Sequence, residues 1–175
     1  GLITCLGPVG LGGVVNARFR GAKVIAVDSA PYRQQLAGEL GAQLVLDPTD
    51  DRLLEKIRAA TDGRGVDCAL DCSGAVPAHR LCIDATRRKG KVAFVGECSG
   101  DTTFQASRDM IRKGLTLIGS WHYNLNSYPR LLHVIRDSPV VGRLVSHEVA
   151  IDDVETAFEL QEQGRTAKVL LKPWA

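Results

Sequence analysis

Residues 2–10 read LITCLGPVG, an apolar run that passes directly into a turn rich in glycine and proline. The run predicts a buried strand over residues 2–6, and the small residues after it predict a turn into a helix from about residue 11 to residue 20. Glycine at position 7 lets another group approach the backbone, and glycine at position 10 lets the helix pack tightly on the sheet. The unpaired N–H groups and partial positive charge at the start of such a helix favour an anion. The stretch therefore predicts a strand–turn–helix unit that binds phosphate.

The turn matches the dinucleotide-binding pattern G-x-G-x-x-G, except that Cys5 stands in the place of the first glycine. The residues predicted to contact a diphosphate are Gly7, Pro8, Val9 and Gly10. An extended backbone at this position would accommodate the side chain of Cys5, although affinity could suffer. A glycine-rich turn alone is a weak signal. This one follows a strand, opens a helix and starts a series of strand–helix units, which makes the signal much stronger.

Short apolar runs alternate with helical patterns six times along the chain. The predicted strands cover residues 2–6, 23–28, 43–46, 66–71, 92–96 and 115–121. Helical patterns between the later strands cover residues 31–40, 52–60, 77–88 and 107–113. The strands are nearly continuous apolar runs, as expected where both faces of a sheet are covered. The pattern predicts an α/β fold of the Rossmann type, a doubly wound six-stranded parallel sheet with helices on both faces.

The second predicted strand ends at Asp28, 18 residues after Gly10. An acid at this point can accept hydrogen bonds from the adenosine ribose hydroxyls and repel a 2′-phosphate, so it favours NAD over NADP. The alternative is that Asp28 only caps the next helix together with Ser29. Arg33, one turn later, is predicted to flank the adenine, and a solvated helix residue is an equally good interpretation.

The pattern changes after the sixth strand. Pro129 opens a predicted helix, Asp152 and Glu155 form a predicted capping box for another, and a strand-like run covers residues 167–172. Ala157 and Phe158 are expected to supply the apolar face of the second helix, and Gly164 is expected to end it. We expect this tail to add no further βαβ unit and to dock on a domain outside the chain.

The chain has 175 residues, 45% of them hydrophobic and 24% charged, which is enough for one full core. Its formal net charge is only +2. The densest basic run, Arg87, Arg88 and Lys89, is expected to end a helix before Gly90 and offset its dipole, which we favour over a nucleic-acid patch. No apolar stretch reaches the about 18 residues of a membrane span, and no signal peptide opens the chain. We therefore expect a cytoplasmic protein with no nucleic-acid or membrane partner.

The five cysteines are Cys5, Cys68, Cys72, Cys82 and Cys98, an odd number without a C-x-x-C pair. Reduced thiols in a reducing compartment explain them best. No trio of His, Cys and Glu has the spacing of a zinc site, so neither metal ligands nor catalytic residues are predicted here. Because the chain starts at Gly1, directly before an apolar strand, we expect it to be a fragment.

Several segments together resemble the zinc-type medium-chain dehydrogenase/reductase family. They are residues 7–10, 21–28, 39–42, 63–67, 71–74 and 90–96, and in the tail residues 147, 157–158 and 168–171. The resemblance spans essentially the whole chain, in order and with similar spacing. It implies that residues 1–144 form the Rossmann domain and that residues 145–175 return to a GroES-like catalytic domain that is absent from the chain.

The resemblance also implies a function. In the full enzyme, zinc would bind the oxygen of an alcohol or polyol and lower its pKa, and hydride would pass between this substrate and NAD. The zinc ligands would lie outside this chain, so the fragment would bind cofactor without turnover. The region around Trp121 resembles polyol and threonine dehydrogenases more than ethanol-type enzymes.

Three further loops are implied as cofactor contacts. The loop beside the adenosine half is Cys72, Ser73 and Gly74; the loops whose backbone would meet the nicotinamide carboxamide are Val95, Gly96 and Glu97, and Ile118, Gly119 and Ser120. His122 as a proton relay and Tyr123 as a substrate contact are less favoured than a surface histidine and a packing tyrosine. The sixth strand, if it lies at the sheet edge, could pair two copies into a homodimer or homotetramer, as family members commonly do; a covering loop is the alternative.

Three other functions share part of the pattern. A regulatory NAD-sensing module has the same early motifs, but the family-like tail argues against it. A methyltransferase that uses S-adenosylmethionine usually has a reversed strand in a hairpin, and the sequence predicts none. A zinc-free quinone reductase of the same superfamily would be expected to prefer NADP, against which Asp28 argues.

Overall fold

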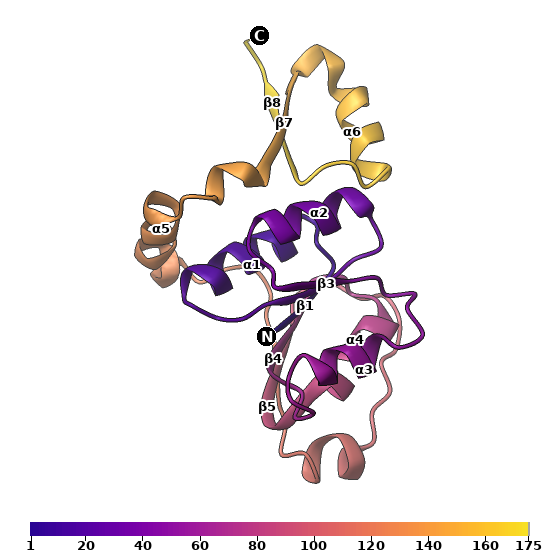
Figure 1. The fold of residues 1–175 in the computed structure, drawn as a ribbon. Coiled ribbons are helices and arrows are strands. Elements are labelled where there is room, and N and C mark those ends of the chain that lie inside the picture. Colours follow the sequence, from indigo (N-terminus) through magenta and orange to yellow (C-terminus); the bar gives the residue numbers. More distant parts are fainter. Residues whose placement is uncertain (175) are drawn as a thin grey trace.

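The structure, a computed structural model, describes residues 1–174 and contains two parallel sheets. The larger sheet has the strand order β3-β2-β1-β4-β5-β6, with every neighbouring pair parallel (Figure 1). Its strands are β1 (Leu2–Thr4), β2 (Ile25–Val27), β3 (Leu44–Leu46), β4 (Val66–Asp71), β5 (Thr86–Phe94) and β6 (Thr116–Gly119). The strand order reverses at β1, which lies between β2 and β4. The predicted doubly wound sheet is therefore confirmed.

Six α-helices connect or follow the strands. They are α1 (Pro8–Phe19), α2 (Pro31–Glu39), α3 (Leu53–Ala59), α4 (Val76–Ala85), α5 (Tyr128–Asp137) and α6 (Val154–Glu162). Four of them, α1, α2, α4 and α5, carry a proline in the first turn, where its fixed φ suits the helix and its missing N–H costs nothing. Because Pro8 starts α1, this helix begins three residues earlier than predicted. Within residues 1–174 no helix is long and apolar enough to cross a membrane.

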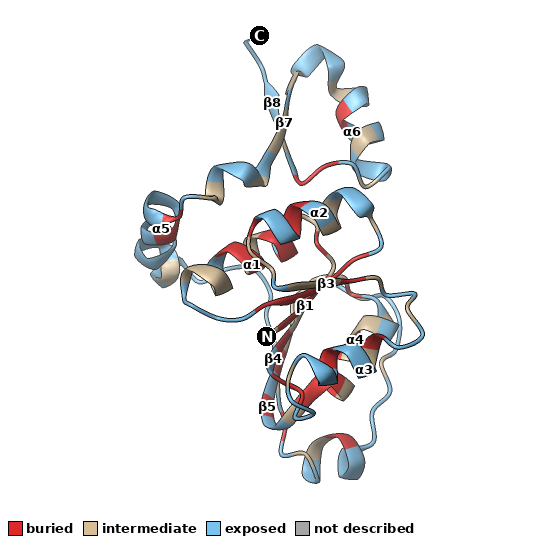
Figure 2. Ribbon diagram, viewed as in Figure 1, coloured by how far each residue is buried: buried red, intermediate tan, exposed pale blue. Residues whose placement is uncertain are grey.

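The sheet separates two apolar cores (Figure 2). One core lies under α1 and α2 and includes Leu11 and Val14, both fully buried. The other lies under α3 and α4 and includes Ile57 and Cys82, also fully buried. Helices thus lie on both faces, as predicted.

The helical cover on the α1 side is incomplete. Over β4, β5 and β6 this face carries a groove of about 580 Å³, whose strand residues include Leu70, Ala93 and Ile118. Ile118 keeps 42% of its surface exposed. The next helix in the chain, α5, packs instead beside α1, where His133 meets the ring of Phe19 edge-on. One half of one sheet face therefore remains open.

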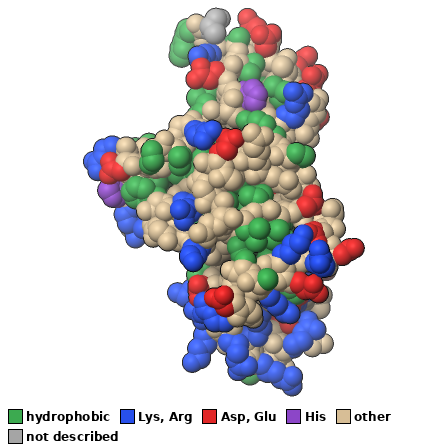
Figure 3. All heavy atoms as spheres, viewed as in Figure 1, with side chains coloured by type: hydrophobic (Ala, Val, Ile, Leu, Met, Phe, Trp, Pro, Cys, Tyr) green, Lys and Arg blue, Asp and Glu red, His purple; other side chains and the backbone are tan. Residues whose placement is uncertain are grey.

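The basic run before Gly90 does not end a helix, which corrects the prediction. Helix α4 ends at Ala85. The hydroxyl of the next residue, buried Thr86, donates a hydrogen bond to the carbonyl of Cys82, and β5 begins at Thr86. The basic residues Arg87, Arg88 and Lys89 therefore lie within β5, close to its amino-terminal end. Figure 3 shows Lys and Arg side chains gathered at this lower end of the molecule.

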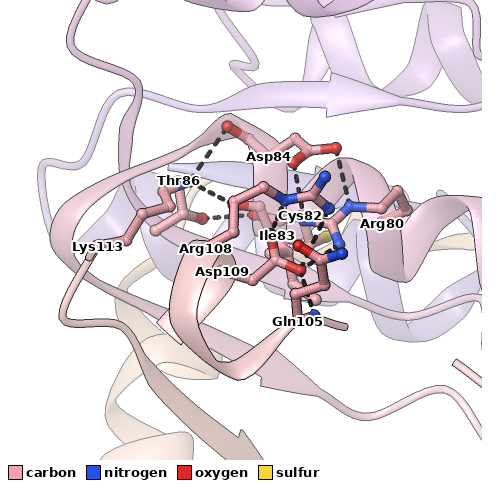
Figure 4. A network of polar contacts seen from close by, with 9 residues as sticks. All are labelled: Arg80, Cys82, Ile83, Asp84, Thr86, Gln105, Arg108, Asp109 and Lys113. Carbon is pink, nitrogen blue, oxygen red and sulfur yellow. Dashed lines mark hydrogen bonds and ion pairs between the residues drawn. The ribbon is translucent and has the colours of Figure 1, made fainter. Parts of the chain in front are cut away.

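The helix predicted over residues 107–113 is a π-helix, η1 (Ala106–Ile111), with an unexpected buried face. Asp109 is buried, whereas Ile111 keeps 74% of its surface exposed. The Asp109 carboxylate accepts hydrogen bonds from Arg108 Nε at 2.8 Å and Arg80 Nη1 at 2.9 Å, and Arg80 also pairs with Asp84 (Figure 4). A charged network, rather than an apolar stripe, joins η1 to α4.

The tail forms a βαβ unit, which corrects the prediction that it adds none. Strands β7 (Val145–Ala150) and β8 (Lys168–Lys172) pair in parallel, and α6 connects them. The predicted capping box is also wrong. Asp152 lies in the short 3-10 helix η4 (Ile151–Asp153), and Asp153, the residue before α6, makes no side-chain cap. Of the predicted apolar face, Ala157 is buried, whereas Phe158 is 66% exposed.

The five cysteines are free thiols, as predicted. Burial raises the pKa of Cys72 and that of Cys82 to about 12. These two thiols are therefore protonated at neutral pH and unreactive.

Candidate cofactor-binding site

A pocket of about 360 Å³ opens at the carboxyl ends of β1, β2 and β4. In a doubly wound sheet this is the crevice where the connections from neighbouring strands diverge to opposite faces. Its lining includes Cys5, Asp28, Arg33, Leu53, Ser73 and Leu81. The pocket therefore combines apolar walls with a small number of polar groups, as ligand sites usually do.

The turn predicted to bind phosphate, hereafter the phosphate-binding turn, lies beside this pocket. Gly7 precedes α1 with extended backbone angles (φ −66°, ψ −173°), and no side chain caps the helix start. The first turn of α1 contains no acidic residue. Its N–H groups and the helix dipole are therefore available to an anion.

Gly10 is required by a close approach of two backbone segments. A Cβ atom at Gly10 would lie 1.8 Å from the carbonyl oxygen of Cys5, whereas a Cβ atom at Gly7 would meet nothing within 4 Å. The open space at Gly7 leaves room for a ligand, and the crowding at Gly10 brings α1 against the end of β1. The close packing at Gly10 is the packing that the sequence predicts for this glycine, and the role of Gly7 in ligand approach stays a prediction.

The backbone at Cys5 is not the extended conformation that would accommodate its side chain without strain. Cys5 has φ +66°, in the left-handed region that favours glycine, and its N–H donates a hydrogen bond of 2.8 Å to the carbonyl of Val27. The dihedral explains why the pattern normally has glycine here, since a side chain in this region costs about 1 kcal/mol. Cys5 bears that strain while lining the pocket.

Asp28 reaches from the end of β2 to the phosphate-binding turn. Its carboxylate is 7% exposed and lies in the pocket lining. Oδ2 accepts a hydrogen bond from the N–H of Leu6 at 2.5 Å, and Oδ1 accepts one from the N–H of Ala30 at 2.8 Å. The second contact forms a turn before α2, so a local role is present. Each oxygen has a further lone pair for a ligand hydroxyl.

Arg33 lies in the pocket lining and also contacts the tail. Its Nε donates a hydrogen bond of 3.1 Å to the carbonyl of buried Thr166, between α6 and β8. Arg33 is thus not a solvated helix residue, and part of its hydrogen-bonding capacity is used by the tail rather than by the pocket.

The loops after β4 and β5 interlock. Ser73 lines the pocket, and Gly74 (φ +70°) packs so closely that a Cβ atom there would lie 1.9 Å from the carbonyl oxygen of Glu97. A Cβ atom at Gly96 would in turn lie 2.1 Å from the nitrogen of Gly74. The structure therefore brings the loop of Cys72 and the loop of Val95 together.

Of the predicted cofactor contacts, only Asp28, Arg33 and Ser73 line this pocket. Ile118 lines the open groove on the sheet face instead. Gly119 and Ser120 lie at the end of β6, where the N–H of Ser120 donates to the carbonyl of Phe94 at 3.0 Å. Tyr123 is 81% exposed, and the His122 ring lies edge-on to Trp121.

Two polar residues of this region were missed by sequence reasoning as parts of the site. Thr4 ends β1 and lines the pocket, and Asp71 ends β4, fully buried beneath it. The sequence contained a signal for both residues, namely a polar side chain in the last position of an apolar strand. Such a side chain is buried and needs a hydrogen-bond partner.

No group of three or more His, Cys, Asp or Glu side chains within residues 1–174 is placed to hold a metal ion. The described residues therefore do not fit a zinc ion, and no step of a reaction is assigned to one on this chain.

Comparison with known proteins identifies a family. The profile described as zinc-binding dehydrogenase matches residues 8–137. An L-threonine 3-dehydrogenase of Symbiobacterium thermophilum is 33% identical over 98% of the chain and 50% of its own length. A sorbitol dehydrogenase of Halalkalibacterium halodurans is 31% identical over 98% of the chain and 51% of its own length.

Solved structures agree with these relatives. An alcohol dehydrogenase from Thermotoga maritima superposes with a TM-score of 0.88 at 29% identity, over 97% of this chain and 48% of that one. A 2R,3R-butanediol dehydrogenase from Bacillus subtilis gives a TM-score of 0.88 at 28% identity, over 98% and 50%. The chain spans about half the length of the curated relatives that it matches.

Proposed function

Because the chain belongs to the zinc-binding dehydrogenase family, we propose that it is the NAD-binding part of an oxidoreductase that transfers hydride between a secondary alcohol or polyol and NAD. The chain itself binds and orients the cofactor. The observation that carries this proposal is the buried Asp28 carboxylate, which lies in the pocket and is hydrogen-bonded to the turn before α1.

The cofactor fits two complementary features of the chain. The uncapped first turn of α1 offers N–H groups and a partial positive charge to the diphosphate. Asp28 offers acceptors to the ribose diol and repels a 2′-phosphate, which favours NAD over NADP. The gap at Gly7 leaves space for the diphosphate to approach.

In the proposed reaction, the nicotinamide of NAD would accept the hydride. The residues of this chain would fix its position. Asp28 and the start of α1 would hold its adenosine and diphosphate, and the backbone after β5 and β6 would meet the nicotinamide end. The zinc ligands belong, in this proposal, to a part of the protein outside residues 1–175.

We assign residues 1–144 to the Rossmann domain and residues 145–175 to a segment that joins the catalytic domain. Support comes from the separate β7–α6–β8 unit, since a two-stranded sheet is only marginally stable by itself. The free thiols agree with the proposed cytoplasmic location.

Assembly through β6 is part of the same proposal. β6 is the edge strand of the large sheet, and most of its residues are exposed. Its unpaired backbone groups can pair with a second copy, giving a homodimer or homotetramer.

The test is equilibrium titration with NADH and with NADPH, followed by fluorescence. In Asp28→Asn the charge is removed and the size is kept. We expect NADH affinity to fall about 10- to 100-fold, because a hydrogen bond to a charged group is lost. The ratio of NADH to NADPH affinity should fall at least about tenfold.

Asp47→Asn is the matched control. Asp47 follows the neighbouring strand β3 and is hydrogen-bonded to Thr49, outside the pocket lining. The control should leave the affinity ratio unchanged. An unchanged ratio in Asp28→Asn, or equal changes in both variants, would contradict the proposed role of Asp28.

A further inference from the structure

One fully buried carboxylate organises the end of β4. Asp71 Oδ1 accepts hydrogen bonds from Thr4 Oγ1 at 2.8 Å and from Ser73 Oγ at 2.6 Å. Its Oδ2 accepts one from the N–H of Gly74 at 2.9 Å. Thr4 and Ser73 both line the cofactor pocket. Asp71 therefore connects two walls of the pocket from beneath without reaching it.

The backbone of the same residue holds the neighbouring loop. The carbonyl of Asp71 accepts hydrogen bonds from the N–H groups of Val95 at 2.9 Å and Gly96 at 3.2 Å. Gly96 is the residue that interlocks with Gly74. A displacement of Asp71 would thus be transmitted to both loops at this end of the sheet.

The remaining partner of Asp71 is a buried histidine of α4. His79 is 6% exposed, and its Nε2 lies 3.1 Å from Asp71 Oδ2. Its Nδ1 lies 2.7 Å from Thr102 Oγ1, and its ring packs edge-on against Phe94. Burial raises the pKa of Asp71, but the hydrogen bonds donated by Ser73, Gly74 and Thr4 outweigh it and leave the pKa below its usual value. The ionised carboxylate can only accept, so Nε2 carries the proton.

We propose that His79 is a positioning residue for the cofactor pocket: the hydrogen bond from its Nε2 holds Asp71 where Thr4, Ser73 and the loop after β5 are aligned for the dinucleotide. This inference rests on the proposed NAD binding. A histidine with only a packing role would contribute to stability without affecting the affinity of the folded protein.

Two variants separate these roles. In His79→Gln the side-chain amide can occupy the place of Nε2 and keep the donor to Asp71. In His79→Asn the amide reaches only the place of Nδ1, so the contact to Thr102 is kept and the donor to Asp71 is lost. Thr102→Val removes the Nδ1 partner alone and is the control.

NADH binding to the intact chain is measured by fluorescence titration, at a temperature where each variant is folded. We expect affinity within about threefold of wild type for His79→Gln and Thr102→Val, and a loss of about tenfold or more for His79→Asn. Equal affinities in His79→Gln and His79→Asn would overturn the inference while leaving NAD binding intact. Failure of the wild-type chain to bind NADH would overturn the proposed function and this inference with it.

A measurement on the wild-type chain does not depend on how the variants fold. Nitrogen NMR of the His79 ring reports which nitrogen carries the proton. We expect the Nε2–H tautomer and a change of its resonance when ADP-ribose is added. A proton on Nδ1 alone, or a resonance that ADP-ribose leaves unchanged at saturation, would contradict the positioning role.

Discussion

At the scale of single residues, acids at the ends of strands β2 and β4 organise the candidate site. Asp28 accepts the N–H of Leu6, and Asp71 accepts that of Gly74, so each carboxylate fixes the turn that follows a strand. Both acids are buried, and a buried carboxylate is stable only when donors surround it. A ligand that donates to Asp28 therefore acts directly on the turn before α1, whereas Asp71 acts on the pocket from beneath.

Two glycines of α1 allow a direct test of the phosphate-binding turn. In Gly10→Ala the new Cβ atom would lie 1.8 Å from the carbonyl oxygen of Cys5, so the turn must move. We expect a loss of stability of about 1–3 kcal/mol, typical of overpacking, and weaker NADH binding. Urea unfolding and NADH titration measure the two effects.

Gly12→Ala, in the same helix, is the control. A Cβ atom there meets nothing within 4 Å, so the substitution should stabilise α1 by about 0.5–1 kcal/mol and leave NADH affinity unchanged. If the two variants behaved alike, the close approach of α1 and β1 would not matter for binding.

At the scale of elements, helix α4 joins the two ends of the sheet. His79, in its first half, lies beneath the candidate cofactor pocket. The next residue, Arg80, pairs with Asp84 in the last turn of α4 and with Asp109 of η1 (Figure 4). The connection from β5 to β6 is thereby attached to the same helix as the loop after β4. The same helix packs against β1, β4 and β5.

The ion network of η1 predicts a pH dependence of stability. Hydrogen bonds from Arg108 and Arg80 hold the pKa of Asp109 well below its usual range. A carboxyl whose pKa is lowered in the folded state stabilises the protein above its unfolded pKa, about 3.9, and this contribution is lost as the pH falls toward the folded value. Asp109→Asn should therefore lower the Tm by several degrees at pH 7, and its difference from wild type should shrink below about pH 4.

Asp137→Asn is the control for this prediction. Asp137 is paired with Arg136 and also has a lowered pKa, but both side chains are largely solvated, so its loss should shift the Tm little. A difference between Asp109→Asn and wild type that stays constant from pH 7 to about pH 2.5 would contradict the role of the Asp109 charge.

At the scale of the whole molecule, hydrophobic periodicity was enough to predict the fold. The six strands and their helices were predicted because each buried run is short, apolar and bounded by glycine or proline. Predictions failed where one local contact decided the outcome. Thr86 ends α4 and turns the basic run into a strand, and the charges around Asp109 bury an acid on η1.

In the candidate site, too, some features could be predicted from the sequence pattern and others depended on individual contacts. The phosphate-binding turn and Asp28 were predicted from spacing, because a strand end and a helix start determine their positions. The φ of Cys5, the hydrogen bond from Arg33 to Thr166 and the identity of the partners of Asp71 could not be predicted, since they depend on contacts between distant segments. That Asp71 and Thr4 need polar partners could have been predicted from their positions at the ends of buried strands. The open groove over β4 to β6 likewise follows from the path of α5 beside α1.

The most direct measurement is a crystal structure of the chain with NADH. We predict that the diphosphate lies against the first turn of α1 and that the adenosine ribose hydroxyls are hydrogen-bonded to the carboxylate of Asp28. Cofactor bound elsewhere, or a pocket that stays empty at saturating NADH, would contradict the account.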